Sequence, residues 1–285
     1  PTLLKKLKLK VHFYDLFQKN LDDEINKTKG KLLIIVSVFY GFKPWIDYKK
    51  IQKKFKNKVF ILVDGAQTAY AHKDYSLPDY GAILSCPHKS LGVNDGAILK
   101  LTNFNDFLKK KYNLLLKEKK FSDYKKLSRQ LTNSGNSSRE KTGLKYSKKL
   151  EETWKSIPEK KMSIKSLNNF LKIDPKKHKK NRLRNFFYVK NQLRNLIVFP
   201  KNLKPGCPYG FPILHKKRDK VVKLLHQKRV FCTSLWKDNK YSQKKYKNSV
   251  KYQRNFMALP IDQRYKINDL RELTKRVKLV LKELK

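Results

Sequence analysis

The sequence predicts an α/β fold: a mostly parallel sheet with helices on both faces, followed by a smaller C-terminal α/β domain. Short apolar runs rich in β-branched residues, such as LLIIVSV (32–38) and VFILV (59–63), recur through the first half, and stretches with helical periodicity separate them. The 285 residues are 39% hydrophobic, which is enough for a packed core. We therefore expect a large domain over 1–150 and a small domain over 151–285.

The first half alternates strand-like and helix-like segments. Apolar or alternating runs predict strands over 11–16, 32–39, 59–63, 81–86 and 96–101. Helical periodicity predicts helices over 21–29, 46–56, 104–130 and 144–154. The polar stretch LTNSGNSSREKT (131–142) is rich in Gly and Ser and predicts a loop. This order is typical of β-α-β units in a parallel sheet.

The second half has more helix than strand. Helices are expected over 164–171, 179–196, 218–227 and 267–284, the last of them amphipathic. Strands are expected over 196–199, 211–214 and 229–235. These elements predict the smaller α/β domain.

The charge is large but has an ordinary explanation. Lys and Arg number 69 against 23 Asp and Glu, a formal net charge of +46. Only 11 of the basic residues are Arg, the side chain on which base recognition most depends. An abundance of Lys beside Asn, Ile, Phe and Tyr is what an A- and T-rich genome encodes. We therefore favour background composition over a nucleic-acid partner, which stays as an alternative.

Other patterns narrow the class of protein. No apolar run approaches the roughly 18 residues that a membrane span needs, and nothing resembles a signal peptide, so a cytoplasmic location is expected. Cys86, Cys207 and Cys232 are far apart and lack CxxC or Cys/His ligand spacing. We predict free thiols and no metal site, with Cys86 and Cys232 as small core residues.

Polar residues with chemical potential follow two of the predicted strands. Asp64 comes directly after the run 59–63, with the small residues Gly65 and Ala66 and then Gln67 behind it. Lys89 lies 25 residues further on, just past the strand predicted over 81–86. Because ligands of open α/β sheets bind at the carboxyl ends of strands, a carboxylate and an amine at neighbouring ends could hold one ligand between them.

Pyridoxal phosphate matches this pair of groups. Its aldehyde needs a lysine amine to form a Schiff base, and its ring nitrogen needs a carboxylate to stay protonated. Its phosphate needs donors such as the Ser85 hydroxyl. The combination of D-x-x-Q with S-x-x-H-K, flanked by buried strands, is far more specific than either motif alone.

At these residues the sequence resembles the fold-type-I pyridoxal-phosphate enzymes, most closely the DegT/DnrJ/StrS aminotransferases, which act largely on nucleotide-linked sugars. The resemblance implies Lys89 as the lysine of the Schiff base and Asp64 as partner of the ring nitrogen. It further implies Gln67 at the ring hydroxyl, Ala66 against the ring face and Ser85 on the phosphate. His88 is assigned equally to the phosphate and to structural packing.

The likeness extends over nearly the whole chain. Upstream, 32–41 followed by Asp47 is similar to the family's strand, glycine turn and helix. Downstream, the runs starting at Phe211 and Met257 are similar to its small domain. The family's N-terminal segment, with a glycine-containing phosphate loop, has no counterpart, so the chain is expected to begin inside the large domain. The resemblance implies a homodimer that uses an amino donor and a keto sugar acceptor.

Two alternatives stay open. The pair His88-Lys89 also resembles the class-V branch with its cysteine desulfurases, for which Cys207 would be the reactive cysteine. The chain could instead be a basic nucleic-acid-binding protein without catalysis. For Arg218, Arg254 and Arg264, pairing with acidic neighbours such as Asp219 and Asp262 is favoured over contact with a substrate anion.

Overall fold

The computed structural model describes most of the chain. The described residues are 10–15, 18, 21–102, 116–117, 128, 130–131, 136–153, 160–194, 204–234 and 246–284. None of the helices in these ranges is both long and apolar enough to cross a membrane.

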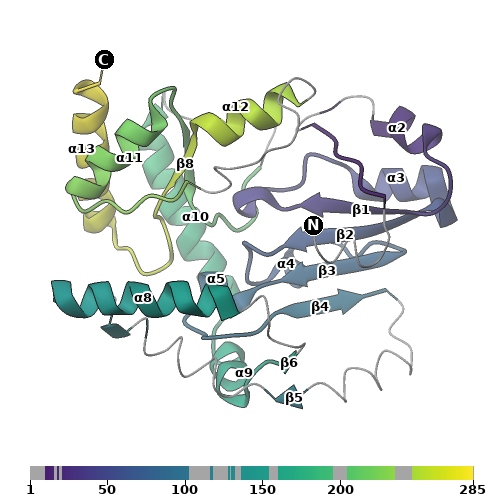
Figure 1. Cartoon of the computed structure of the whole chain (residues 1–285), viewed down its shortest axis with the longest axis horizontal. Helices are drawn as coiled ribbons and strands as arrows, with labels where there is room; N and C mark the ends of the chain where they lie inside the picture. Colours follow the sequence, from purple (N-terminus) through teal and green to yellow (C-terminus); the bar gives the residue numbers. More distant parts are fainter. Residues whose placement is uncertain are drawn as a thin grey trace.

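A sheet of four strands forms the centre of the first half (Figure 1). Its order is β1 (Leu32–Ser37), β2 (Val59–Gly65), β3 (Gly81–Ser85) and β4 (Ile98–Leu101). The first three strands are parallel, and β4 pairs antiparallel with β3. The α/β class and the mostly parallel sheet predicted from the sequence are confirmed, and parallel neighbours bring the carboxyl ends of β2 and β3 to one edge.

The two faces of the sheet differ. One face buries Ile61, Val63 and Ile83 against α2 (Leu21–Lys27) and α3 (Tyr48–Phe55). The other face exposes large apolar side chains from three strands, and these are Leu33, Ile35, Phe60 and Leu99. Since side chains alternate along a strand, Asp64 belongs to the second face and Ser85 to the first.

A second hydrophobic cluster lies in the C-terminal half. The antiparallel pair β7 (Phe211–Leu214) and β8 (Phe256–Leu259) packs with α10 (Pro175–Gln192), α11 (Arg218–Gln227) and α13 (Ile267–Lys282). Tyr40 and Phe42, at the short helix η1 (Phe39–Gly41), pack into the same cluster. The end of β1 is therefore fixed against the C-terminal half.

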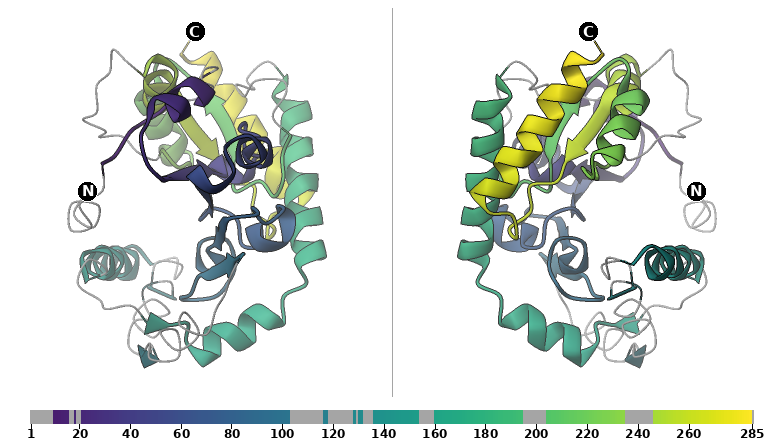
Figure 2. Two further views of the ribbon diagram at one scale, coloured as in Figure 1. Left: turned by 90° about the vertical axis from the view of Figure 1, so that its right-hand side faces the viewer. Right: turned by 90° about the vertical axis from the view of Figure 1, so that its left-hand side faces the viewer.

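The helix α10 connects residues 160–174 to the C-terminal hydrophobic cluster (Figure 2). It begins directly after Asp174, whose Oδ1 accepts the N–H groups of Lys176 and Lys177, and Pro175 occupies its first turn. It therefore starts earlier than the predicted 179. Near it, α9 (Ile164–Leu171) brings Phe170 onto Tyr70, with ring centroids 5.2 Å apart.

The remaining elements are short or peripheral. They are η2 (Lys56–Lys58), α4 (Ala71–Asp74), α5 (Pro87–Ser90), α8 (Ser137–Thr153), α12 (Lys247–Asn255), and the pair β5 (Leu116–Lys117) and β6 (Lys160–Lys161).

Two predicted strands are wrong. Residues 11–15 form no strand, and Tyr14 instead donates its hydroxyl to the Ile35 carbonyl at 2.7 Å and packs beside Trp45. In 229–234, only an isolated bridge joins Thr233 to Ala258, so the segment touches the edge of β8 without forming a ladder.

Two helix and loop assignments are also corrected. Part of the predicted loop 131–142 is helical, because Asn136 Oδ1 accepts the N–H groups of Ser138 and Arg139 and so starts α8. Within the predicted helix 104–130, Leu116 and Lys117 pair with Lys160 and Lys161 as strands. The rest of that helix, apart from residues 128 and 130, and the predicted strand 196–199 lie outside the described residues.

Candidate active site

Lys89 sits in the single turn α5, directly after β3. Pro87 occupies the first turn of α5, and the Leu91 N–H donates to the Pro87 carbonyl at 2.8 Å. The neighbours of Lys89 are buried, and the imidazole Nδ1 of His88 contacts the Gly96 carbonyl at 2.8 Å. The turn is thus anchored on both sides while the Lys89 side chain is exposed.

A cavity of about 520 Å³ opens beside Lys89. Its walls come from the Lys89 turn, from α10, from the end of β8 and from the segment that follows β8. Its polar and charged lining includes Lys89, Asn94, Arg182, Thr233, Asp262 and Arg264. The cavity therefore lies between the end of a parallel sheet and the C-terminal cluster, where ligands of α/β folds bind.

The charges on the cavity wall favour an anion. Asp262 is paired with Arg264, with Nη2 and Oδ2 2.8 Å apart, and this hydrogen-bonded contact lowers the pKa of the Asp262 carboxyl against the opposing effect of burial. Burial lowers the pKa of the Arg182 guanidinium, which nevertheless stays protonated because an arginine begins so high. With the Asp262–Arg264 pair neutral overall, Lys89 and Arg182 give the wall its positive charge.

Asp64 and its neighbours occupy the end of β2. Asp64 Oδ1 accepts the N–H of Ala66 at 3.0 Å, which closes the turn after the strand. Gln67 faces the end of β1, because its Oε1 accepts the N–H of Tyr40 at 2.8 Å. Neither Asp64 nor Gln67 belongs to the lining of the cavity beside Lys89.

Ser85 faces the opposite side of the sheet from Asp64. Its Oγ accepts the backbone N–H of His72 at 3.0 Å and contacts His72 Nδ1 at 2.9 Å. To bind a phosphate, the Ser85 hydroxyl would have to give up these contacts with His72. Of the six residues predicted for the site, only Lys89 lines the cavity, while Asp64, Ala66 and Gln67 lie together at the adjacent strand end.

The cysteines are structural in this arrangement. Cys86, Cys207 and Cys232 are all buried, none of them forms a disulfide, as predicted, and Cys207 is 2% exposed. Burial raises the pKa of the Cys207 thiol to about 11, so at neutral pH it is not a thiolate. The desulfurase alternative, which needs a reactive Cys207, is disfavoured. Among the described residues, no group of three or more His, Cys, Asp or Glu side chains could hold a metal ion.

Sequence reasoning missed the residues that build the far wall of the cavity. Arg182 is one of many basic residues on a Lys-rich helix, and nothing local distinguishes it. Tyr209 and Gln263 lie in loops without a motif. The predicted pairings of Arg218 with Asp219 and of Arg264 with Asp262 are confirmed.

Comparison with known proteins defines the fold. No family model and no curated protein matches the chain. Solved structures do match. A DegT DnrJ EryC1 StrS aminotransferase from Brucella abortus has a TM-score of 0.52 at 12% identity over 86% of this chain and 63% of its own. The GDP-4-keto-6-deoxymannose-3-dehydratase ColD with bound GDP-perosamine has a TM-score of 0.61 at 13% identity, over 96% of this chain and 76% of its own.

A third structure agrees with these two. The aminotransferase TlmJ from Streptoalloteichus hindustanus has a TM-score of 0.54 at 12% identity, over 92% of this chain and 69% of its own. The chain shares the fold of these three structures. It spans less than two thirds of the Brucella protein's length. These structures confirm the fold that the sequence resemblance at Asp64 to Lys89 implied.

The side chains at these strand ends fit pyridoxal phosphate at two positions. An exposed lysine borders a positively charged cavity, and a carboxylate stands at the carboxyl end of the neighbouring parallel strand. These are the amine and the acid that the cofactor's aldehyde and ring nitrogen need.

Proposed function

We propose that this protein is a pyridoxal-phosphate-dependent aminotransferase that transfers an amino group to a nucleotide-linked keto sugar. The observation that carries the proposal is the position of Lys89. It is exposed and lines the cavity of about 520 Å³, in a turn directly after a buried parallel strand of this fold. A small-molecule amino donor and a homodimer with sites at the subunit interface are part of the same proposal, as is a cytoplasmic location.

The chemistry that the bound cofactor supplies is an aldehyde for covalent capture of amines and a ring that withdraws electrons. Lys89 Nζ would hold the cofactor covalently through its aldehyde carbon. With an amino donor bound, the free Lys89 amine would be the general base that moves a proton between the substrate carbon and the cofactor carbon. Its exposure to the cavity allows both tasks.

Asp64 would keep the ring nitrogen of the cofactor protonated. The turn that follows it, closed by its contact with the Ala66 N–H, fixes the carboxylate at the strand end. Gln67 and Ala66 stand in the same turn, where the first is proposed to meet the ring hydroxyl and the second the ring face. Ser85 and His88 are proposed at the phosphate, which for Ser85 means exchanging its contact with His72.

The test uses the full-length protein with added pyridoxal phosphate. We expect a visible absorbance band that an amino-acid donor bleaches and a nucleotide-linked keto sugar restores. Lys89→Ala should lack the band. Lys100→Ala removes an exposed lysine of β4 that does not line the cavity, and it should behave as wild type.

The proposal is overturned if the wild-type protein forms no such band, or if Lys89→Ala forms it as readily as wild type. A band that amino donors bleach but that no keto sugar restores would retain the aminotransferase and overturn the sugar acceptor.

A further inference from the structure

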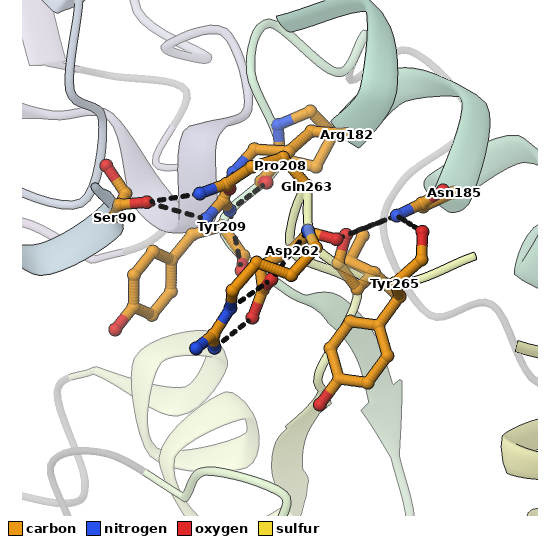
Figure 3. A network of polar contacts seen from close by, with 10 residues as sticks. Ser90, Arg182, Asn185, Pro208, Tyr209, Asp262, Gln263 and Tyr265 are labelled. Atoms are coloured by element: carbon orange, nitrogen blue, oxygen red, sulfur yellow. Dashed lines mark hydrogen bonds and ion pairs between the residues drawn. The ribbon is translucent and has the colours of Figure 1, made fainter. Parts of the chain in front are cut away.

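Arg182 is a buried cation whose hydrogen bonds go to neutral groups. Its side chain is 2% exposed. Nη1 donates to the carbonyls of Pro208 at 2.7 Å and Tyr209 at 3.1 Å, and Nε donates to Gln263 Oε1 at 2.9 Å. Nη2 donates to the carbonyl of Ser90 at 3.3 Å. Figure 3 shows these bonds converging from three segments of the chain.

The Ser90 carbonyl is the point at which this network reaches the candidate catalytic lysine, because Ser90 directly follows Lys89. A second donor meets the same oxygen, since Gln263 Nε2 lies 3.1 Å from it. Arg182, Gln263 and the Ser90 carbonyl therefore form a closed triangle of hydrogen bonds. The Lys89 turn is tied through it to α10 and to the segment after β8.

The burial of a charge without a bound carboxylate is costly. The carboxylate that acts on Arg182 is that of Asp262, which is held by Arg264 at 2.8 to 2.9 Å. What Arg182 offers that an apolar residue does not is a planar fork that reaches several carbonyls at once. The burial of Arg182 is thus better explained by the carbonyls that it holds in place than by a contribution to stability alone.

We propose that Arg182, with Gln263, is a positioning residue for Lys89. By fixing the Ser90 carbonyl, the pair sets where the Lys89 backbone stands relative to the cavity and so presents the amine to a bound aldehyde. This role rests on the proposed function, because it gives Lys89 its geometry for cofactor capture. Displacement of a reacting group by about 1 Å can cost on the order of 100-fold in rate.

Two variants separate the contacts from the charge. Arg182→Lys keeps the positive charge but loses the fork, and Gln263→Leu removes both contacts of the glutamine while Arg182 stays. The matched control is Arg184→Met, two residues along the same helix. Arg184 donates to Asn185 and to the carbonyl of Tyr265, and it does not touch the Lys89 turn.

The first measurement is hydrogen exchange of the cofactor-free protein in the peptide 86–92. We expect exchange there to rise about 10-fold or more in Arg182→Lys and Gln263→Leu, without a rise in β7 and β8, and to stay unchanged in Arg184→Met. The second is the rate at which pyridoxal phosphate is trapped on Lys89 by borohydride, with the pH at which the visible band is half developed. In the first two variants the rate should fall about 10-fold or more and the pH midpoint should shift.

Two results contradict the role of Arg182. One is wild-type exchange in 86–92 and wild-type trapping in both variants. The other is exchange that rises equally throughout the C-terminal cluster, which would make the contacts structural only. Gln263 is only partly buried, so Gln263→Leu decides the matter if Arg182→Lys does not fold. Failure of wild type to trap the cofactor at all would overturn the proposed function instead.

Discussion

Two turns of this molecule carry the two side chains that could start covalent chemistry, and they differ in what surrounds them. The Lys89 turn and the loop 204–210 that carries Cys207 are both held by Arg182, through the carbonyls of Ser90 and Pro208. Lys89 is exposed to the cavity, whereas Cys207 is 2% exposed.

Backbone contacts explain the burial of Cys207. The Gly41 carbonyl accepts the N–H groups of Gly206 at 2.9 Å and Cys207 at 3.0 Å, which holds the loop against the end of η1. The thiol is thereby enclosed, and burial raises its pKa. Of these two nucleophiles, only Lys89 is therefore accessible from the cavity.

Gly41→Ala, which disturbs the loop 204–210, should cause the largest loss of unfolding free energy. Gly41 has φ of 76°, and a Cβ there would lie 1.9 Å from the Cys207 carbonyl oxygen. Strain and overlap together should cost about 2–5 kcal/mol of unfolding free energy, measured by urea denaturation.

Gly30→Ala is the matched control for that change. Gly30 has φ of 80° but nothing within 4 Å of its added Cβ, so only the backbone cost of about 1 kcal/mol should appear. Equal losses in the two variants would show that the close approach to Cys207 does not matter.

A smaller effect is a pH dependence of the unfolding free energy that comes from His178, which lies on α10 one turn before Arg182. His178 is buried, and neither ring nitrogen has a hydrogen-bond partner among the described residues. Burial, and then the charge of Arg182, lower its pKa from 6.5 to about 4. The unfolded chain therefore binds a proton between these values that the folded state excludes, so stability falls as pH decreases from 6.5 to 4.

The size of this effect is about 3 kcal/mol across that range. It is measured as the difference in unfolding free energy between wild type and His178→Leu, which cancels the titration of the shared carboxylates. Matching pH profiles in the two proteins would contradict a buried neutral His178.

The smallest effect should come from Cys207→Ala. Removal of the thiol should cost on the order of 1 kcal/mol of stability and leave cofactor trapping at Lys89 unchanged. In the native wild-type protein, alkylation of Cys207 at neutral pH should be as slow as unfolding, measured by mass spectrometry. Rapid alkylation, or loss of trapping in the variant, would reopen the cysteine alternative.

The part of the site that the sequence predicted is local in the chain. Asp64 and Lys89 each follow a buried apolar run, and a motif of a few residues marks both strand ends. The parallel pairing of β2 with β3 then brings those ends to one edge, as the β-α-β order predicted.

The rest depends on contacts between distant segments. Ser90 meets Arg182 across 92 positions and Gln263 across 173, and neither partner carries a local signal. The same reason explains why the strand predicted over 229–235 is wrong. The segment is apolar, as a strand would be, but its packing against β8 leaves it a single bridge, from Thr233 to Ala258. The start of α8 was missed for a local cause, since Asn136 was interpreted as a loop residue although it caps the helix.

The most direct test of the central claim is a map of where the cofactor is captured. The chain has 57 lysines besides Lys89, and each of them could react with the aldehyde of pyridoxal phosphate. They differ from Lys89 only in their surroundings. The full-length protein would be treated with less than one equivalent of pyridoxal phosphate, reduced with borohydride and digested for mass spectrometry. We predict one dominant adduct, on Lys89, that is absent from Lys89→Ala. Adducts spread over the surface lysines, in the same pattern with and without Lys89, would contradict it.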